Sequence, residues 1–197
     1  QEYTIEFLAR NYWQSLTAHD IHNVHLVGHS MGGYVVMEMA AQESQRVASL
    51  CLVHSHVFAD NEEKKKARTA VLDEIRSAGK DGFVERMINS MAFDKETMKP
   101  ILEKLVQRGL LYSDDAWYYG TQAIRDRRDH AETLRQFQNP VMMIMGEEDK
   151  AVPVELAYKQ APLASNNRLV IYPGVGHLSM YENPTSLIRD LISFYAS

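Results

Sequence analysis

The chain has one cysteine, no long apolar run and no excess of positive charge. The single thiol, Cys51, cannot form an intramolecular disulfide, and its place in an apolar run predicts a small buried core residue. No apolar stretch approaches the roughly 18 to 20 residues that a membrane-spanning helix needs. Lysine and arginine number 21 against 26 acidic residues, so a formal charge of −5 offers nucleic acid no basic face. We therefore expect a small-molecule substrate as partner, and neither nucleic acid nor a membrane.

A secretory signal and an initiator methionine are also missing from the start of the chain. The first absence predicts a cytoplasmic location. The second indicates a chain cut from a longer one, because a helical pattern begins almost at once. Of the 197 residues, 45% are apolar and 24% are charged, which is typical of a globular protein with a sizeable core. The composition is compatible with a homo-oligomer.

Short β-branched runs alternate with helical patterns along much of the chain. Four of them predict buried parallel strands, at residues 23–28, 47–53, 140–145 and 168–172. The opening helix should bury a face made of Ile5, Leu8, Tyr12 and Leu16. The middle of the chain is charged and helical, with expected breaks at Gly79, Gly82, Pro100 and Gly109. The pattern predicts an α/β fold in which core parts 1–57 and 138–197 flank a helical cap, 58–137.

The segment Gly28-His29-Ser30-Met31-Gly32 separates the first apolar run from the next helical pattern. This is the strand–turn–helix setting in which a G-x-S-x-G motif forms a nucleophile elbow. The serine of such an elbow lies in a strained turn, so we expect Gly28 and Gly32 to let the strand and the helix approach each other. Taken alone, the motif also fits a glycine-rich turn without chemistry.

Asp149 and His177 follow the third and fourth predicted strands. The carboxyl ends of parallel strands meet at one edge of a sheet, so Ser30, Asp149 and His177 can lie together there. Serine needs a base to take its proton when it attacks a carbonyl, and His177 would be that base and then the acid for the leaving group. Asp149 would fix the tautomer of the imidazole and stabilise its charged form. Glu147, Glu148 and, more distantly, Asp60 are alternatives for the acid.

The other histidines and aromatic residues have competing interpretations. His54 and His56 could suggest a metal site, but residues at i and i+2 of an extended segment face opposite ways and no Cys or carboxylate cluster accompanies them. We therefore expect no metal and no cofactor. Substrate contacts are expected from His29, His56, Trp117 and Tyr118, although ordinary packing explains the two aromatic residues equally well.

Three segments together resemble the signature loops of the α/β-hydrolase fold family: Gly28-His-Ser-Met-Gly-Gly33, Gly146-Glu-Glu-Asp-Lys-Ala-Val-Pro153 and Gly174-Val-Gly-His177. They are similar to capped carboxylesterase, enol-lactonase, haloperoxidase-like and aminopeptidase-like branches. The resemblance implies that Ser30 is the nucleophile, Asp149 the acid and His177 the base, in the family's chain order. It also implies that the backbone N–H of Met31 is one oxyanion-hole donor. The family's first strands, with the second donor, are absent here, which leaves strand 23–28 as an unpaired apolar edge.

The sequence predicts a serine hydrolase that cleaves a small ester, lactone, thioester or amide through an acyl-enzyme. An acyltransferase is a variant of this hypothesis, because a dry pocket favours an acceptor other than water. The alternative from another class is a non-catalytic binding module of α/β-hydrolase type, or an inactive fragment. The absence of the second oxyanion-hole donor favours that alternative, because the loss of one such contact lowers the rate by about 10² to 10³.

Overall fold

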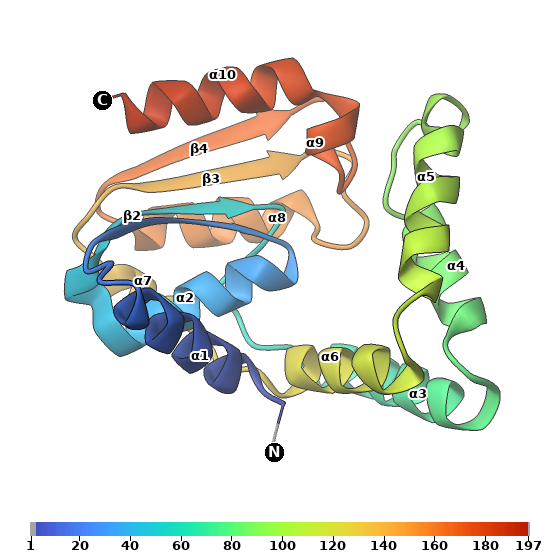
Figure 1. Ribbon diagram of the computed structural model, residues 1–197. Helices are drawn as coiled ribbons and strands as arrows, with labels where there is room; N and C mark the ends of the chain where they lie inside the picture. The colour runs from blue at the N-terminus through green and yellow to red at the C-terminus, as the bar shows by residue number, and fades with distance from the viewer. Residues whose placement is uncertain (1–2, 197) are drawn as a thin grey trace.

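The computed structural model describes residues 3–196, in which four parallel strands form one sheet in the order β1-β2-β3-β4 (Figure 1). The strands are β1 (Val24–His29), β2 (Val47–Val53), β3 (Val141–Gly146) and β4 (Asn167–Tyr172). The register pairs His29 with Val53 and Val53 with Ile144, so the carboxyl ends of the strands lie together. The predicted α/β fold is confirmed, and the predicted strands match within a residue or two.

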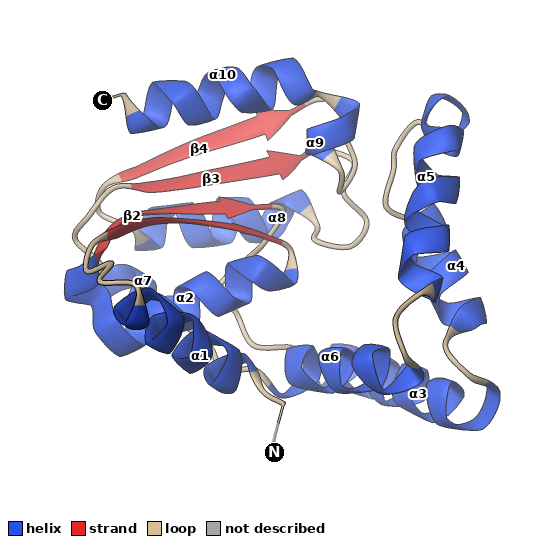
Figure 2. Ribbon diagram, in the orientation of Figure 1, coloured by secondary structure: helices blue, strands red, loops and turns tan. Residues whose placement is uncertain are grey.

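Helices cover both faces of the sheet (Figure 2). They are α1 (Ile5–Ala18), α2 (Met31–Glu43), α7 (Ala131–Gln136), α8 (Val154–Gln160), α9 (Ser179–Glu182) and α10 (Pro184–Tyr195), with 3-10 turns at Ser44–Arg46 and Ala161–Leu163. Alternate residues of β2 face opposite layers: Leu50 and Leu52 pack with α1 and α2, whereas Cys51 and Val53 pack with α10. Cys51 is fully buried, as expected, and burial raises the pKa of its thiol to about 12.

Four further helices lie between β2 and β3: α3 (Glu62–Ala78), α4 (Asp81–Asn89), α5 (Lys95–Leu110) and α6 (Asp114–Asp126). We call residues 62–126 the helical insertion. In Figure 1 it stands beyond the carboxyl ends of the strands. No helix within residues 3–196 has both the length and the hydropathy to span a membrane.

The expected breaks within the insertion were mostly wrong. Only Gly79 separates two helices, whereas Gly82 lies inside α4, and Pro100 and Gly109 lie inside α5. At Gly109 a side chain would collide, because a Cβ there would lie 2.8 Å from Val84. Glycine at this position therefore serves close helix packing and does not end the helix. The division of the chain at residues 58 and 137 stays a prediction.

The first helix is confirmed, but its buried face differs from the predicted one. Ile5, Ala9 and Trp13 are buried, whereas Tyr12 is 57% exposed. The indole N–H of Trp13 donates a hydrogen bond of 3.0 Å to the carbonyl oxygen of Met39 in α2. The rotation of α1 is therefore set by this tertiary contact and by the small side chain of Ala9, which the apolar period alone does not reveal.

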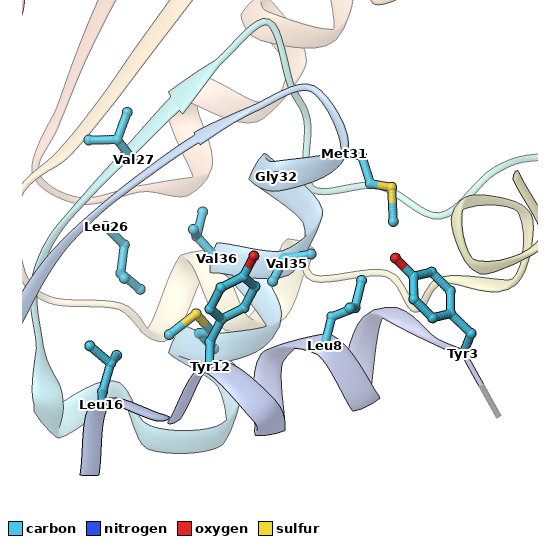
Figure 3. Close-up of a pocket in the computed structure, with 11 residues that line it drawn as sticks. Tyr3, Leu8, Tyr12, Leu16, Leu26, Val27, Met31, Gly32, Val35 and Val36 are labelled. Atoms are coloured by element: carbon cyan, nitrogen blue, oxygen red, sulfur yellow. The ribbon is translucent and has the colours of Figure 1, made fainter. Parts of the chain in front are cut away.

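An apolar groove of about 550 Å³ lies between α1 and the β1–α2 unit (Figure 3). Leu8 and Leu16 of α1 and Val35 of α2 line it, and Val27 of β1 is 48% exposed. Within residues 3–196, β1 pairs only with β2. The groove therefore lies beside an apolar strand that forms an edge of the described sheet.

A buried ion pair joins the two chain segments that connect the insertion to the sheet. Asp60 follows β2 and Arg127 follows α6, and their Oδ1 and Nη2 atoms are 2.8 Å apart with side chains 0% and 2% exposed. Arg68 of α3 also pairs with Asp60. Burial alone would raise the pKa of Asp60, but these two guanidinium groups lower it below its ordinary value. Arg127 further stacks on the ring of Tyr34, 4.1 Å from the ring centroid.

We predict that Asp60→Asn destabilises the protein by about 3 to 5 kcal/mol, because it leaves the buried Arg127 without its counter-charge. Urea denaturation measures the change. The matched control is Glu132→Gln, which breaks the exposed pair between Glu132 and Arg135 and should change stability little. Equal midpoints for the two variants would contradict this account of the junction.

Candidate active site

Ser30 occupies a strained turn between β1 and α2. Its backbone angles are φ 53° and ψ −120°, outside the regions that residues with a side chain prefer. Its N–H donates to the carbonyl oxygen of Val53 at 3.0 Å, and its own carbonyl accepts from the N–H of Gly33 and the hydroxyl of Ser55, both at 2.9 Å. These bonds hold the turn against the end of β2.

The glycines around Ser30 are not equally constrained. A Cβ on Gly28 would lie 2.4 Å from the carbonyl oxygen of Gly32, and a Cβ on Gly33 would lie 2.2 Å from the Ser55 hydroxyl. A Cβ on Gly32 would meet nothing within 4 Å. The predicted role of Gly28 is confirmed, but the second position that must lack a side chain is Gly33, because Gly32 faces the apolar groove.

Met31, the predicted oxyanion-hole donor, is the first residue of α2. The first N–H groups of a helix have no acceptor within that helix, and they form the positive end of its dipole. The Met31 N–H therefore directly follows the Ser30 turn at a position suited to a developing negative charge.

Asp149 and His177 are buried together beyond the ends of β3 and β4. His177 Nδ1 lies 2.7 Å from Asp149 Oδ2. The other carboxylate oxygen, Oδ1, accepts from the N–H groups of Ala151 and Val152, both at 2.9 Å. Burial alone would raise the pKa of Asp149, but the hydrogen bonds from His177 and His54 bring it below its ordinary value. The carboxylate is therefore ionised and fixed in orientation.

The rival acids lie elsewhere. Glu147 and Glu148 are exposed at the start of the same loop, and Asp60 is engaged by Arg127. Among the hydrogen bonds within residues 3–196, His177 Nδ1 is bonded to Asp149 and to none of these three. The geometry therefore favours Asp149 over its rivals.

His29 links the serine turn to the histidine loop. Its Nε2 lies 2.9 Å from the carbonyl oxygen of His177, to which it can only donate, and the two rings are 4.8 Å apart between centroids. Burial and the neighbouring His177 lower the pKa of His29 to about 4, so the ring is neutral near pH 7. The described residues include no hydrogen bond from the Ser30 hydroxyl to His177. Contacts between a nucleophile and its base often tighten only when substrate binds.

His54, for which no contact with the predicted triad was expected, lies against Asp149. Its Nδ1 is 3.0 Å from Asp149 Oδ2, although 95 positions separate the two residues in the sequence. The sequence predicted no Cys or carboxylate cluster beside His54 and His56, and this single carboxylate was not anticipated. One ligand-type atom from each of His54, Asp149 and His177 falls within 4.8 Å of the others, so these three side chains could hold a metal ion. The two hydrogen bonds to Oδ2 account for the same proximity.

Of the four residues predicted to contact substrate, two line a common cavity and two lie elsewhere. His29 and Trp117 line one cavity of about 390 Å³. Other residues that line this cavity are Met87, Met91, Leu105 and Leu178. Tyr118 instead lies under the guanidinium of Arg76, 3.9 Å from its ring centroid. His56 is buried against Tyr34, and burial and the charge of Arg127 lower its pKa to about 3.

We predict that Gly33→Ala and Gly32→Ala have opposite effects. The new methyl at residue 33 collides with the buried Ser55, so we expect a loss of about 1 to 3 kcal/mol in unfolding free energy. At residue 32 it enters open space near the start of α2, where alanine is the better helix former. Thermal and urea denaturation of both variants check this. A Gly32→Ala variant as unstable as Gly33→Ala would refute the assignment.

Comparisons with known proteins agree with the fold. A family model described as alpha/beta hydrolase fold matches residues 1–184. A 2-hydroxy-6-oxo-6-(2'-aminophenyl)hexa-2,4-dienoic acid hydrolase from Metapseudomonas resinovorans is 28% identical over 188 residues, covering 87% of this chain and 59% of that protein. The dihydrolipoyllysine-residue acetyltransferase component of the acetoin cleaving system of Pseudomonas putida is 27% identical over 177 residues, covering 89% of this chain and 46% of that protein.

A solved structure has the same fold. The thermophilic esterase of Thermogutta terrifontis, with malate bound, superposes with a TM-score of 0.90 at 23% identity, covering 98% of this chain and 72% of the esterase. The chain spans 46% and 59% of the two curated relatives above. Because the family model covers most of its length, the chain belongs to the α/β-hydrolase fold family.

Proposed function

We propose that this chain carries the site of a serine hydrolase that cleaves a small ester, lactone, thioester or amide through an acyl-enzyme. The observation that carries the proposal is the fixation of His177 on two sides. Its Nδ1 is bonded to Asp149, and its carbonyl oxygen is bonded to His29, which directly precedes Ser30. A base with its orienting acid is thus tied to the turn that presents the nucleophile.

The proposed reaction uses Ser30, His177 and Asp149 in sequence. Nε2 of His177 takes the proton of the Ser30 hydroxyl as Oγ bonds to the carbonyl carbon. It then gives this proton to the leaving group as the bond between the carbonyl carbon and the leaving group breaks, which leaves the acyl group on Oγ. In the second half, His177 takes a proton from water as the water oxygen bonds to the acyl carbon, and it returns that proton to Oγ as the bond between Oγ and the acyl carbon breaks and the acid is released. The ionised Asp149 balances the imidazolium charge, and the Met31 N–H stabilises the oxyanion.

The cavity beside His29 supports an apolar acyl or alcohol group on the substrate. Its lining includes residues of α4, α5 and α6 of the insertion, residues of α9, and Leu178, the residue after His177. Trp117 is fixed in this wall by a hydrogen bond of 2.9 Å from its indole N–H to the carbonyl oxygen of Gly109. In this proposal the insertion acts as the cap, and His29 and Trp117 contact substrate.

Acyl transfer to an acceptor other than water is a second candidate. The observation in its favour is the name of the Pseudomonas putida relative, an acetyltransferase component. The same acyl-enzyme serves both reactions, and the competition between water and the other acceptor decides the product. Product analysis with and without an added alcohol or thiol separates them.

We predict that a fluorophosphonate probe adds once to the wild-type chain and not to Ser30→Ala, because only an activated serine attacks the phosphorus. Intact-protein mass spectrometry measures the adduct. Ser90→Ala, which removes an exposed serine on the insertion, is the control and should label like the wild type. An unlabelled wild-type chain that binds ligands saturably would instead favour a non-catalytic binding module.

A further inference from the structure

His54 is held at the centre of the site in a backbone conformation that few residues adopt. It directly follows β2 with a φ of 49°, and its side chain is fully buried. Its N–H donates to the carbonyl oxygen of Ile144 in β3 at 2.8 Å. A left-handed backbone is costly for a residue with a Cβ and persists where its surroundings enforce it. The position of this ring is therefore fixed by the sheet.

Two imidazole rings meet the same oxygen of Asp149. His177 Nδ1 lies 2.7 Å from Oδ2, and His54 Nδ1 lies 3.0 Å from it. The other oxygen, Oδ1, is taken by the N–H groups of Ala151 and Val152. The carboxylate cannot turn away from His177 without breaking its other contacts as well.

The protonation state of His54 follows from these contacts. Without a hydrogen on Nδ1, two lone pairs would face each other across 3.0 Å, compensated only by a 3.3 Å contact from the N–H of Gly146. With hydrogens on both nitrogens, the Nε2–H would be buried without an acceptor, since Nε2 has no hydrogen-bond partner within residues 3–196. A neutral ring that carries its hydrogen on Nδ1 avoids both penalties and gives up only the longer 3.3 Å contact from the N–H of Gly146, in exchange for a hydrogen bond of 3.0 Å to a charged acceptor.

The titratable groups that face His54 come from each neighbouring element. His29 ends β1, Asp149 follows β3, His177 follows β4, and Glu182 belongs to α9. Burial lowers the pKa of His54, and the hydrogen bond to Asp149 opposes this effect without overcoming it. His54 therefore stays neutral near pH 7 and keeps donating one hydrogen bond.

We propose that His54 is a positioning residue, whose neutral Nδ1–H shares Asp149 Oδ2 with His177 and so sets how strongly the carboxylate supports the base. This inference rests on the proposed function, in which His177 is that base. A second donor on Oδ2 draws part of the negative charge away from the imidazolium of His177. The acid limb of the pH profile of kcat/KM then lies at a lower pH than it would if His177 were the only histidine bonded to Asp149.

The first test reads the tautomer directly and needs no substrate. We predict that ¹⁵N-histidine NMR of the whole chain shows two ring N–H protons shifted far downfield, from Nδ1 of His54 and Nδ1 of His177. His54→Leu removes one and keeps the other. A spectrum in which Nδ1 of His54 carries no hydrogen would overturn the assignment.

The second test compares pH profiles of kcat/KM with p-nitrophenyl acetate. His54→Asn keeps an N–H donor and suits a left-handed backbone, so its acid limb should match the wild type. His54→Leu removes the donor and should move the acid limb to higher pH by about half to one unit. A purely structural role would lower the plateau in both variants and leave the limb in place, which would contradict the proposal.

Two controls separate this inference from the proposed function. Turnover that survives Ser30→Ala would remove the serine mechanism, whereas the NMR tautomer of His54 would stand on its own. The other control is Zn²⁺. If the wild-type chain bound one Zn²⁺ and lost both downfield protons on binding, and if His54→Leu bound none, then His54, Asp149 and His177 would be metal ligands. That result would overturn the positioning role.

Discussion

The carboxylate of Asp149 is the interaction on which the rest of the site depends. It lies on a loop after β3 and accepts hydrogen bonds from its own loop at Oδ1, while the rings of His54 and His177 both contact Oδ2. These contacts connect the loops that follow β2, β3 and β4. A buried carboxylate is costly unless it is fully hydrogen-bonded, so the burial of Asp149 favours the geometry in which both of its oxygens are bonded.

The serine turn depends on the same edge of the sheet. Ser30 is bonded to the end of β2 through Val53 and Ser55, and His29 fastens the turn to the His177 loop. The ion pair of Asp60 and Arg127 joins the two ends of the insertion, which stands beyond the carboxyl ends of the strands (Figure 1). The cavity beside His29 therefore lies between the loops of the sheet and the insertion. The hydrogen bond from His29 holds the loops together, and the ion pair of Asp60 and Arg127 holds the ends of the insertion.

Short motifs at the ends of strands were informative, whereas the helix breaks expected at Gly82, Pro100 and Gly109 were wrong. Ser30, Asp149 and His177 each follow a strand within a short motif, so their meeting at one edge could be predicted from parallel topology. His54 could not be assigned, because its partner is 95 positions away and only the register of β2 against β3 brings them together. The buried face of α1 was wrong for a related reason: the hydrogen bond of Trp13 to α2 sets its rotation.

The most direct measurement is kcat/KM of Asp149→Asn against Glu148→Gln with p-nitrophenyl acetate. Asparagine keeps the shape of the side chain, but it removes the charge and forces the wrong tautomer on His177. We predict a loss of roughly 10⁴-fold, and little change for the exposed Glu148. A modest loss in Asp149→Asn, or an equal loss in Glu148→Gln, would contradict the central place of the Asp149 carboxylate.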